Sequence, residues 1–348
     1  MAGHCATGKI GNEYTAQIGR CIFCLRKKEK YPRIKVQQQK KGLPMYKYGL
    51  VRRVSSVVAG LFGKTRAQRR LNRDKIRYKG LISTVSETRI PRQKYPTKIP
   101  VAFCFDARGC KMAAVTIKSL LLASAGRCDY DIYCVVTEDV DKDLKDIVRG
   151  VVKGSGSKVH FVVGNHDFDE SSRGKWPVAM WYRLMLPKLV PDVSRIIYAD
   201  LDIIFFGDLI DIYEYDLGKN VIAAVPTRTN MYINSGFLLM DLDKIRKENI
   251  YEKWVLDSKT HDYYNPDQDV LNFTLKGRIA FLPLRYNFQL SHGSRIFKIY
   301  SESQLDDLKH NLVVLHYSDY IKPWSTGIRP VFSEYWWDVA RKTGLFQE

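Results

Sequence analysis

From Ile99 onward, short apolar segments alternate with amphipathic ones, and this alternation limits the folds open to the chain more than any other feature. The expected elements follow in this order: strand 99–106, helix 110–125, strand 129–137, helix 139–152, strand 158–164, helix 176–190 and strand 194–202. Each strand is an apolar run that lacks the period-two alternation of a sheet with one face in water. The pattern therefore predicts an α/β fold in which helices cover both faces of a parallel sheet.

The order of elements loosens beyond Asp202. Further strands are expected at 220–227, 232–242, 278–283 and 311–318, and further helices at 243–258 and 267–276. Before residue 96 the sequence is charged, rich in Gln and broken by Pro and Gly, which does not indicate a packed core. We therefore expect two parts, a basic N-terminal arm at 1–95 and one α/β domain at 96–348.

Positive charge is concentrated in the first quarter of the chain. Residues 1–99 hold 25 Lys and Arg against 4 Asp and Glu, a balance of +21, whereas the rest of the chain carries −2 of the overall +19. Such an arm suits an anionic surface, for example membrane phospholipid, lipopolysaccharide phosphate or nucleic acid. The arginine run at 69–77 has no nucleic-acid-binding fold around it, so we expect no nucleic acid partner.

Within the arm, apolar residues recur at helical spacing between Leu50 and Leu61, and Lys and Arg surround them. This pattern predicts a short basic amphipathic helix. Two interpretations stay open, because such a helix either packs on the main domain or binds an anionic membrane surface.

Targeting signals and cysteine usage bear on location. The N-terminus lacks a charged segment followed by an apolar one, so no secretory signal is expected. No window approaches eighteen uninterrupted apolar residues, and we expect no transmembrane helix. Seven scattered Cys argue for a reducing compartment. These features predict a cytoplasmic protein, with peripheral binding to the inner face of the cytoplasmic membrane as a further hypothesis.

Two carboxylates stand one residue apart where an apolar run ends, in the segment YADLDIIFFGDL at 198–209. Two ionised carboxylates about 4 Å apart repel each other by roughly 4 kcal/mol at an effective dielectric near 20. Apolar runs on both sides argue against a solvated turn, so a bound cation explains the pair better. Asp200 and Asp202 therefore predict a Mg²⁺ or Mn²⁺ site, with Asp106 expected at the same edge of the sheet.

The segment at 194–225, SRIIYADLDIIFFGDLIDIYEYDLGKNVIAAV, resembles the core of glycosyltransferase family eight, which includes glycogenin and bacterial lipopolysaccharide galactosyl- and glucosyltransferases. Further matching segments follow the order of that family: 101–121, 181–189, 233–246, 265–272 and 316–324. The resemblance spans residues 99–324 and leaves out the arm. It implies a GT-A, Rossmann-like fold with a mixed, mostly parallel central sheet.

The resemblance also implies roles for individual residues. The implied metal ligands are Asp200, Asp202 and His316; the implied donor-binding residues are Asp106, Asn234, Ser235, Gly236 and Lys322; and the implied sugar-facing catalytic residues are Arg183, Asp267 and Gln268. Taken without the resemblance, His316 is typical of a core histidine, Lys322 of a surface lysine, and Asp267 of a helix cap.

The implied activity is retaining transfer of a hexose, galactose or glucose, from a UDP-sugar to a glycan or glycolipid acceptor such as lipopolysaccharide. A histidine ligand favours Mn²⁺ over Mg²⁺ as the cofactor. Gln268 is a poor nucleophile, and the sequence shows no carboxylate pair of the kind used by retaining glycosidases. Front-face departure and double displacement therefore both stay open.

The sequence departs from the family pattern at two positions that bear on donor binding. Asp319 stands where the family has a Gly that lets backbone N–H groups approach a phosphate. It either turns outward or brings negative charge towards the diphosphate. In addition, the loop between 220–227 and 232–242 is short and lacks the sugar-contacting acid that relatives carry there.

Four weaker signals leave alternatives open. The arm and Asp319 are compatible with an anion- or membrane-binding protein whose transferase domain is degenerate, and abundant Tyr with a self-glucosylating protein like glycogenin. Cys21 and Cys24, near His4 and Cys5, have the ligand types of a zinc site but lack a second Cys pair. The aromatic segment 334–344 is compatible with a sugar-binding platform or with a packed terminal helix.

Overall fold

The structure is a computed structural model that describes residues 94–172, 177–227, 232–290 and 300–346. The chain divides into two units, Met1–Val58 and Ala59–Glu348, and every described residue belongs to the second. The basic arm, its expected amphipathic helix and the Cys21 and Cys24 pair lie outside the described residues.

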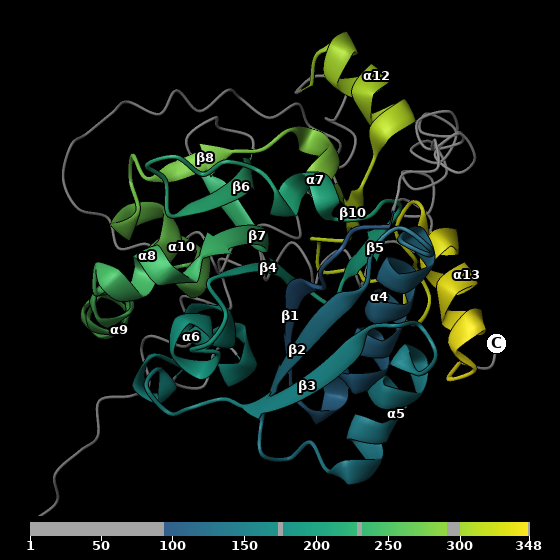
Figure 1. Ribbon diagram of the computed structural model, residues 1–348, viewed down its shortest axis with the longest axis horizontal. Coiled ribbons are helices and arrows are strands. Elements are labelled where there is room, and N and C mark those ends of the chain that lie inside the picture. The colour runs from purple at the N-terminus through teal and green to yellow at the C-terminus, as the bar shows by residue number, and fades with distance from the viewer. Residues whose placement is uncertain (1–93, 173–176, 228–231, 291–299, 347–348) are drawn as a thin grey trace, which may run out of the picture. The chain divides into compact units, whose positions relative to one another are not determined.

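A seven-stranded sheet forms the centre of the described part, in the order β3-β2-β1-β4-β7-β6-β8 (Figure 1). Its strands are β1 (Ile99–Phe105), β2 (Tyr130–Val136), β3 (Lys158–Val163), β4 (Arg195–Ala199), β6 (Ile222–Pro226), β7 (Ile233–Asp241) and β8 (Ile279–Phe281). Neighbouring strands are parallel except where β7 pairs with β4 and with β6. The expected mixed, mostly parallel sheet is confirmed.

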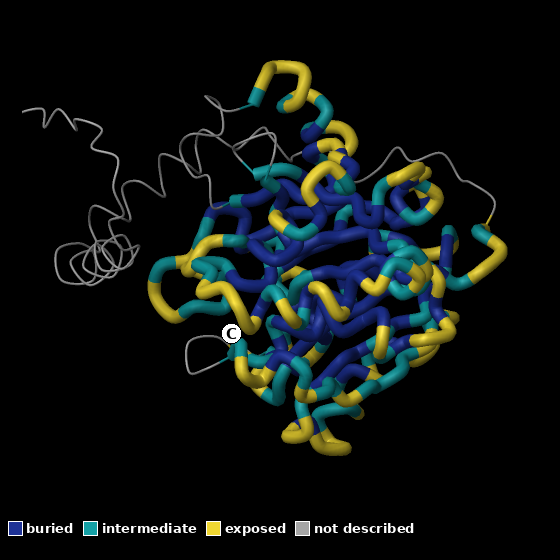
Figure 2. Tube along the Cα trace, turned by 90° about the vertical axis from the view of Figure 1, so that its left-hand side faces the viewer, coloured by how far each residue is buried: buried dark blue, intermediate teal, exposed yellow. Residues whose placement is uncertain are grey.

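Helices cover both faces of this sheet, as the apolar strands require. One face packs against α4 (Cys110–Ala123), α5 (Lys142–Val152) and α13 (Ser333–Thr343), and the other against α6 (Tyr182–Leu189), α8 (Leu242–Lys247), α9 (Ile250–Thr260) and α10 (Pro266–Thr274). The pleat of β1 serves both cores, because Val101 and Phe103 join the first while Ala102 and Cys104 join the second. Figure 2 shows these strands as the buried interior.

A second, three-stranded sheet in the order β5-β10-β9 lies beside the first. It consists of β5 (Ile203–Phe205), β10 (Val314–His316) and β9 (Phe288–Gln289), with η4 (Leu284–Tyr286) and α12 (Glu302–Asn311) next to it in the chain. Strands β5 and β9 and helix α12 were not expected from the sequence. Strand β5 directly follows the two acids, and its antiparallel pairing places His316 opposite Ile203.

Two expected helices are interrupted. The helix expected at 243–258 is wrong as one element, because Asn249 adopts a left-handed conformation with φ 51° and separates α8 from α9. Asn tolerates this conformation better than most residues. The helix expected at 176–190 is divided into η3 (Val178–Met180) and α6. Further short elements are η1 (Ala107–Gly109), η2 (Asp169–Ser172) and α7 (Ile210–Tyr213).

The strand order reverses beside β1. From β1 the chain moves outward to β2 and β3 and then returns to β4 on the other side of β1. The chain therefore leaves β1 and β4 in different directions, and the carboxyl ends of two such strands are the usual place for a ligand in open α/β sheets. Asp106 follows β1 directly, and Asp200 follows β4 directly.

The aromatic segment near the C-terminus is a packed helix. Helix α13 buries Trp336 completely, and the indole Nε1 of Trp337 donates a hydrogen bond of 3.0 Å to the carbonyl of Pro323. No helix within the described ranges is long and apolar enough to cross a bilayer.

We expect Trp254→Ala to lower the free energy of unfolding by about 3–5 kcal/mol, because truncation of a fully buried indole leaves a cavity. Its Nε1 also donates to Thr274 Oγ1 at 2.9 Å. The matched control on the same helix is Leu256→Ala, whose side chain is 65% exposed and whose loss is expected within about 0.5 kcal/mol. Urea denaturation followed by far-UV circular dichroism measures the free energy of unfolding of both variants. Equal losses of stability in the two variants would contradict the described core.

Candidate functional site

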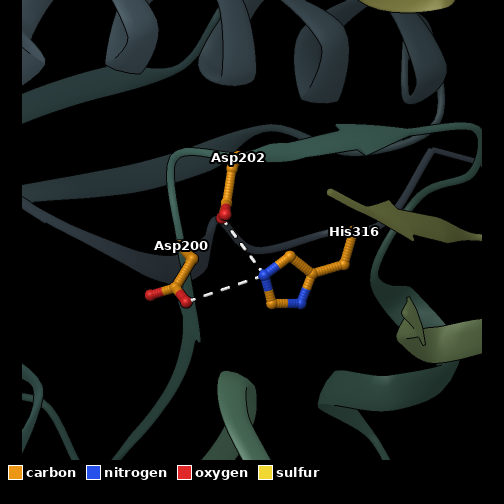
Figure 3. A group of neighbouring side chains, drawn as sticks. All are labelled: Asp200, Asp202 and His316. Atoms are coloured by element: carbon orange, nitrogen blue, oxygen red, sulfur yellow. Dashed lines mark ion pairs between the residues drawn. The ribbon is translucent and has the colours of Figure 1, made fainter. Parts of the chain in front are cut away.

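Asp200, Asp202 and His316 form a cluster at the end of the central strand (Figure 3). Each offers one ligand atom, and these atoms all lie within 4.8 Å of one another. His316 Nε2 lies 3.1 Å from Asp202 Oδ1 and 3.8 Å from Asp200 Oδ2. The structure thus brings together the three metal ligands that the sequence resemblance implied, although more than a hundred residues separate His316 from the acids.

Each carboxylate has one oxygen engaged and the other directed towards His316. Asp200 Oδ1 pairs with Arg183 Nη2 at 3.0 Å and accepts a 2.6 Å hydrogen bond from Tyr198. Asp202 Oδ2 accepts a hydrogen bond of 2.5 Å from Lys322 Nζ. The oxygens left over are those facing the imidazole, so the two acids present one oxygen each to a shared position.

Gly236 makes room for this position. A Cβ at residue 236 would lie 2.3 Å from His316 Cε1 and 2.6 Å from Asp200 Oδ2, closer than real Cβ contacts come. The backbone of the same residue also fixes Asp200, because its carbonyl accepts the Asp200 N–H at 2.8 Å. Gly236 is therefore required by space, which its implied donor-binding role alone does not explain.

The charge of Asp202 is maintained against burial. Burial by itself would raise the pKa of this carboxyl, but the nearby His316 and Lys322 outweigh it and hold the pKa well below its usual range. Asp202 is thus ionised at every physiological pH, which a metal ligand requires.

Lys322 lies against the metal ligands, and this contact was not expected. Its ammonium donates to Asp202 and also to the carbonyl of Tyr317 at 2.8 Å. The implied role for Lys322 was contact with a diphosphate. In the described structure the lysine instead contacts Asp202 Oδ2, whereas the other oxygen, Oδ1, lies 3.1 Å from His316 Nε2.

Arg183 contacts β7, α10 and the turn after β4, which all lie around the acids. The guanidinium is buried and contacts Asp267 Oδ2 through Nε at 3.1 Å, Asp200 through Nη2, and the Ser235 carbonyl through Nη1 at 2.8 Å. It also stacks 4.5 Å from the centre of the Tyr198 ring. Its donors are thus directed at protein groups, which makes it a clamp between two carboxylates.

Asp267 and Gln268 begin α10 and face β7. Asp267 is buried, and burial raises the pKa of its carboxyl. The positive charge of Arg183 lowers this pKa, and the negative charge of Asp200 raises it further. Ser235 Oγ donates to Asp267 Oδ2 at 2.9 Å. The half-buried Gln268 uses its Oε1 to accept from the Ser235 backbone N–H at 3.1 Å and from Asn234 Nδ2 at 3.2 Å.

Asp106 and Asp319 each make the contacts described here within their own loop. Asp106 caps the turn after β1 by accepting from the Gly109 N–H at 3.1 Å, and Arg108 pairs with it at 2.6 Å. Asp319 is exposed, and its Oδ1 accepts the N–H of Tyr320.

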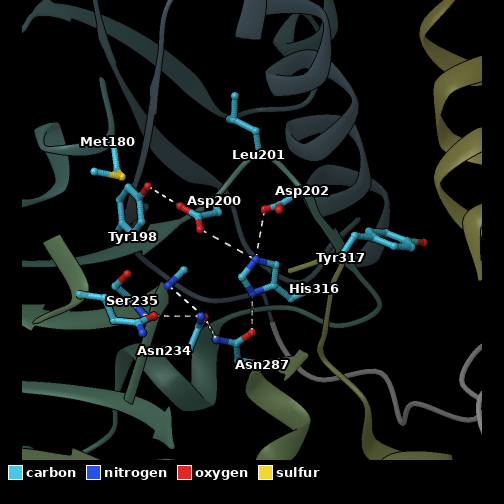
Figure 4. A network of polar contacts seen from close by, with 12 residues as sticks. Met180, Tyr198, Asp200, Leu201, Asp202, Asn234, Ser235, Asn287, His316 and Tyr317 are labelled. Carbon is cyan, nitrogen blue, oxygen red and sulfur yellow. Dashed lines mark hydrogen bonds and ion pairs between the residues drawn. The ribbon is translucent and has the colours of Figure 1, made fainter. Parts of the chain in front are cut away.

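Two residues of the network were missed from the sequence. Tyr198 precedes the acids on β4, where it is typical of a core aromatic; its burial raises its pKa well above the usual value, so its hydroxyl stays a donor to Asp200. Asn287 lies in a loop before β9, and its Oδ1 accepts a hydrogen bond of 2.9 Å from His316 Nδ1 (Figure 4). No sequence signal singles out Asn287, because Arg285 and Gln289 are also polar residues of the segment 284–290.

This sheet, with an aspartate pair and a histidine at its switch point, defines the class of GT-A glycosyltransferases. The fold matches that of the galactosyltransferase LgtC solved with donor and acceptor sugar analogues, with a TM-score of 0.62, 21% identity, and coverage of 72% of this chain and 98% of that one. The structure of glycosyltransferase GlyE from Streptococcus pneumoniae TIGR4 matches with a TM-score of 0.58 and 26% identity, over 72% of this chain and 61% of that one.

The model of glycosyl transferase family 8 matches residues 100–327, and the chain belongs to this family. Among curated relatives, glycosyltransferase GlyE of Streptococcus pneumoniae serotype 4 is 32% identical over 166 residues, 45% of this chain and 40% of that protein. Lipopolysaccharide 1,2-glucosyltransferase of Escherichia coli K12 is 30% identical over 168 residues, 43% of this chain and 50% of that protein. The chain thus spans about half the length of these relatives.

The cluster fits a divalent cation. Two carboxylate oxygens and one imidazole nitrogen are suitable donors, and the residue beside them lacks the Cβ that would fill the space. The site also carries uncompensated negative charge, because Asp200, Asp202 and Asp267 face only Arg183 and Lys322 as permanent cations in the contacts described above.

We expect Gly236→Ala to abolish Mn²⁺ binding while the fold is retained, because the added methyl group collides with His316 and Asp200. Titration of free Mn²⁺ by electron paramagnetic resonance measures binding, and circular dichroism measures the fold. The control is Gly150→Ala in α5, where a Cβ meets nothing within 4 Å and helix propensity favours Ala by about 1 kcal/mol. Wild-type Mn²⁺ affinity in the Gly236 variant would show that the ion does not bind here.

Proposed function

We propose that the chain transfers a hexose from UDP-galactose or UDP-glucose to a glycan or glycolipid acceptor, with retention of anomeric configuration and with Mn²⁺ or Mg²⁺ bound by Asp200, Asp202 and His316. The observation that carries this proposal is the cluster of these three side chains at the switch point of a family 8 chain. Lipopolysaccharide is the acceptor named for one curated relative and is our proposed acceptor class.

The donor set favours Mn²⁺ among the two ions. Mg²⁺ prefers oxygen ligands, whereas Mn²⁺ accepts a nitrogen ligand beside carboxylates more readily. When bound, the ion supplies positive charge to offset the negative charge that develops on a departing diphosphate.

The chain's own residues hold the donor and stabilise the leaving group. Lys322 exchanges its contact with Asp202 for one with the diphosphate, because Asp202 is the only acid that its ammonium pairs with among the described residues. A fixed ammonium there adds to the stabilisation of the leaving oxygen. Asp106, at the end of β1, is our proposed contact to the nucleoside.

The sugar side of the proposed site is formed by Gln268, Asn234 and Asp267. The Gln268 carbonyl oxygen already accepts two hydrogen bonds, from the Ser235 backbone and from Asn234. That oxygen is therefore poorly available as a nucleophile, while its NH₂ group remains able to donate to a sugar. This supports front-face departure and attack over double displacement through Gln268.

Binding of the N-terminal arm to an anionic membrane surface is also part of the proposal, and it rests on the charge of residues 1–99 alone. A glycolipid acceptor lies at such a surface, so the arm would bring the domain close to it.

The decisive experiment is a screen of UDP-sugars with Mn²⁺, comparing wild-type protein with Asp200→Asn plus Asp202→Asn. We expect hydrolysis or transfer from UDP-galactose or UDP-glucose by the wild type, and a loss of at least about a hundredfold in the double variant, because the ion loses both carboxylates. Product release is measured as UDP, and the anomeric configuration of the product by NMR.

The matched control is Asp192→Asn, an exposed acid in the loop before β4, which should leave the rate unchanged. Full activity of the double variant would refute the metal role, and no turnover of any UDP-sugar by the wild type would refute the transferase proposal.

We expect Lys322→Met to lower kcat by about a hundredfold, because the ammonium acts on the charge that develops in the transition state. Steady-state kinetics with the donor found in the screen separates kcat from KM. The exposed Lys142 on α5 provides the control, Lys142→Met, expected to match the wild type. A rise in KM at constant kcat would mean that Lys322 only binds the ground state.

A further inference from the structure

We propose that Asn287 is a positioning residue that holds the His316 imidazole with its proton on Nδ1 and its Nε2 towards Asp200 and Asp202. We propose further that the side chains of Asn234 and Gln268, on the donor side of the site, fix the orientation of Asn287. This inference rests on the proposed function, because it assumes that Nε2 binds the metal ion.

The argument begins at two backbone N–H groups, which can only donate. The Gly236 N–H lies 3.1 Å from Asn234 Oδ1, and the Ser235 N–H lies 3.1 Å from Gln268 Oε1. These contacts identify the oxygen end of both amides, because reversal of either one would bring two donors together.

The next step leads from Asn234 to Asn287. With its oxygen facing Gly236, Asn234 directs Nδ2 to Gln268 Oε1 at 3.2 Å, which is an acceptor. Asn234 Oδ1 also accepts from Asn287 Nδ2 at 2.9 Å. A reversed Asn287 would place its own oxygen against that of Asn234, so Asn287 has one satisfactory orientation.

That orientation decides which imidazole nitrogen carries the proton. Asn287 Oδ1 lies 2.9 Å from His316 Nδ1 and can only accept, so Nδ1 must be the donor. A neutral imidazole then has its lone pair on Nε2, the nitrogen that faces both aspartates. Metal-binding histidines are commonly oriented by such a hydrogen bond from the second nitrogen.

Burial makes the arrangement rigid. Asn287 is 0% exposed and His316 is 2% exposed, so bulk water does not compete for these hydrogen bonds. Every amide in the series also has a partner on the side that sets its orientation. The series therefore connects the sugar-facing residues Asn234 and Gln268 to the metal ligand. A substitution at Asn234 should change the orientation of the His316 imidazole.

The first test measures Mn²⁺ affinity by electron paramagnetic resonance, with and without saturating UDP, in Asn287→Leu and in the control Gln289→Leu. Leu approximates the size of both amides and removes their polar atoms. Gln289 lies two residues further on in β9, is 1% exposed, and its Nε2 has no hydrogen-bond partner among the described residues. We expect a loss of roughly tenfold to a hundredfold for Asn287→Leu and wild-type affinity for the control.

The second test is a double-variant cycle with Asn234→Leu, a residue that makes no described hydrogen bond to a metal ligand. We expect Asn234→Leu to weaken Mn²⁺ binding by a smaller factor, and Asn234→Leu with Asn287→Leu to be no weaker than Asn287→Leu alone, because both changes break one series. Additive losses would mean that the two amides act separately and would overturn the connection to the donor side.

A third measurement is made on the wild-type protein, and a variant serves only to assign the signal. In wild-type protein labelled with ¹⁵N-histidine, the His316 Nδ1 should give the signal of a protonated nitrogen both in metal-free protein and with Mg²⁺ and UDP. His316→Gln identifies the signal by its loss. A deprotonated Nδ1 in either state overturns the inference, as does wild-type Mn²⁺ affinity in Asn287→Leu.

The two levels of the proposal fail differently. If wild-type protein binds neither Mn²⁺ nor Mg²⁺, the proposed function fails and the positioning role fails with it. If the wild type binds Mn²⁺ and the Asn287 variant binds it equally well, only the positioning role fails.

Discussion

The repulsion among three carboxylates at one end of the central sheet is the constraint on which the rest of the site depends. Asp200 and Asp202 present oxygens within 4.8 Å of each other, and Asp267 shares Arg183 with Asp200. Two ionised carboxylates about 4 Å apart repel each other by roughly 4 kcal/mol at an effective dielectric near 20. Arg183 offsets part of this cost by pairing with Asp200 and Asp267, and Lys322 offsets another part by pairing with Asp202. Removal of one partner from such buried pairs leaves an uncompensated charge, which is strongly destabilising. The remaining negative charge is what makes the site attractive to a cation.

The two sheets divide the work of forming this site. The large sheet supplies the acids, because the chain must leave β4 at the point where the strand order reverses. The small sheet supplies the histidine, since β5 begins directly after the acids and pairs with β10, which ends at His316. Helix α13 stabilises the segment that carries Lys322 through the hydrogen bond from Trp337 to Pro323. Each ligand is thus held by regular structure, which keeps the donors in place before an ion arrives.

Much of the scaffold was predictable because it follows from local patterns. The strands β1 to β4 are apolar runs bounded by polar turns, and their alternation with helices indicates a covered parallel sheet. The break at Asn249 was not predictable, because the apolar spacing continues through it and only the tertiary packing of α8 and α9 shows that the chain turns there. Strand β9 was missed for a similar reason, since two residues are too short to carry a periodic signal.

By itself, the sequence determined the α/β class, the placement of two acids at a strand end, and the resemblance of residues 99–324 to a glycosyltransferase family. These depend on residue type and short-range spacing, which a sequence displays directly. The tertiary structure alone decided that His316 faces Asp202, that Lys322 contacts the same acid, that Arg183 is a clamp between carboxylates, and that Asn287 orients the histidine. Those contacts join residues far apart in the chain, and they form because burial forces each polar group to find a partner wherever the packed strands bring one within reach.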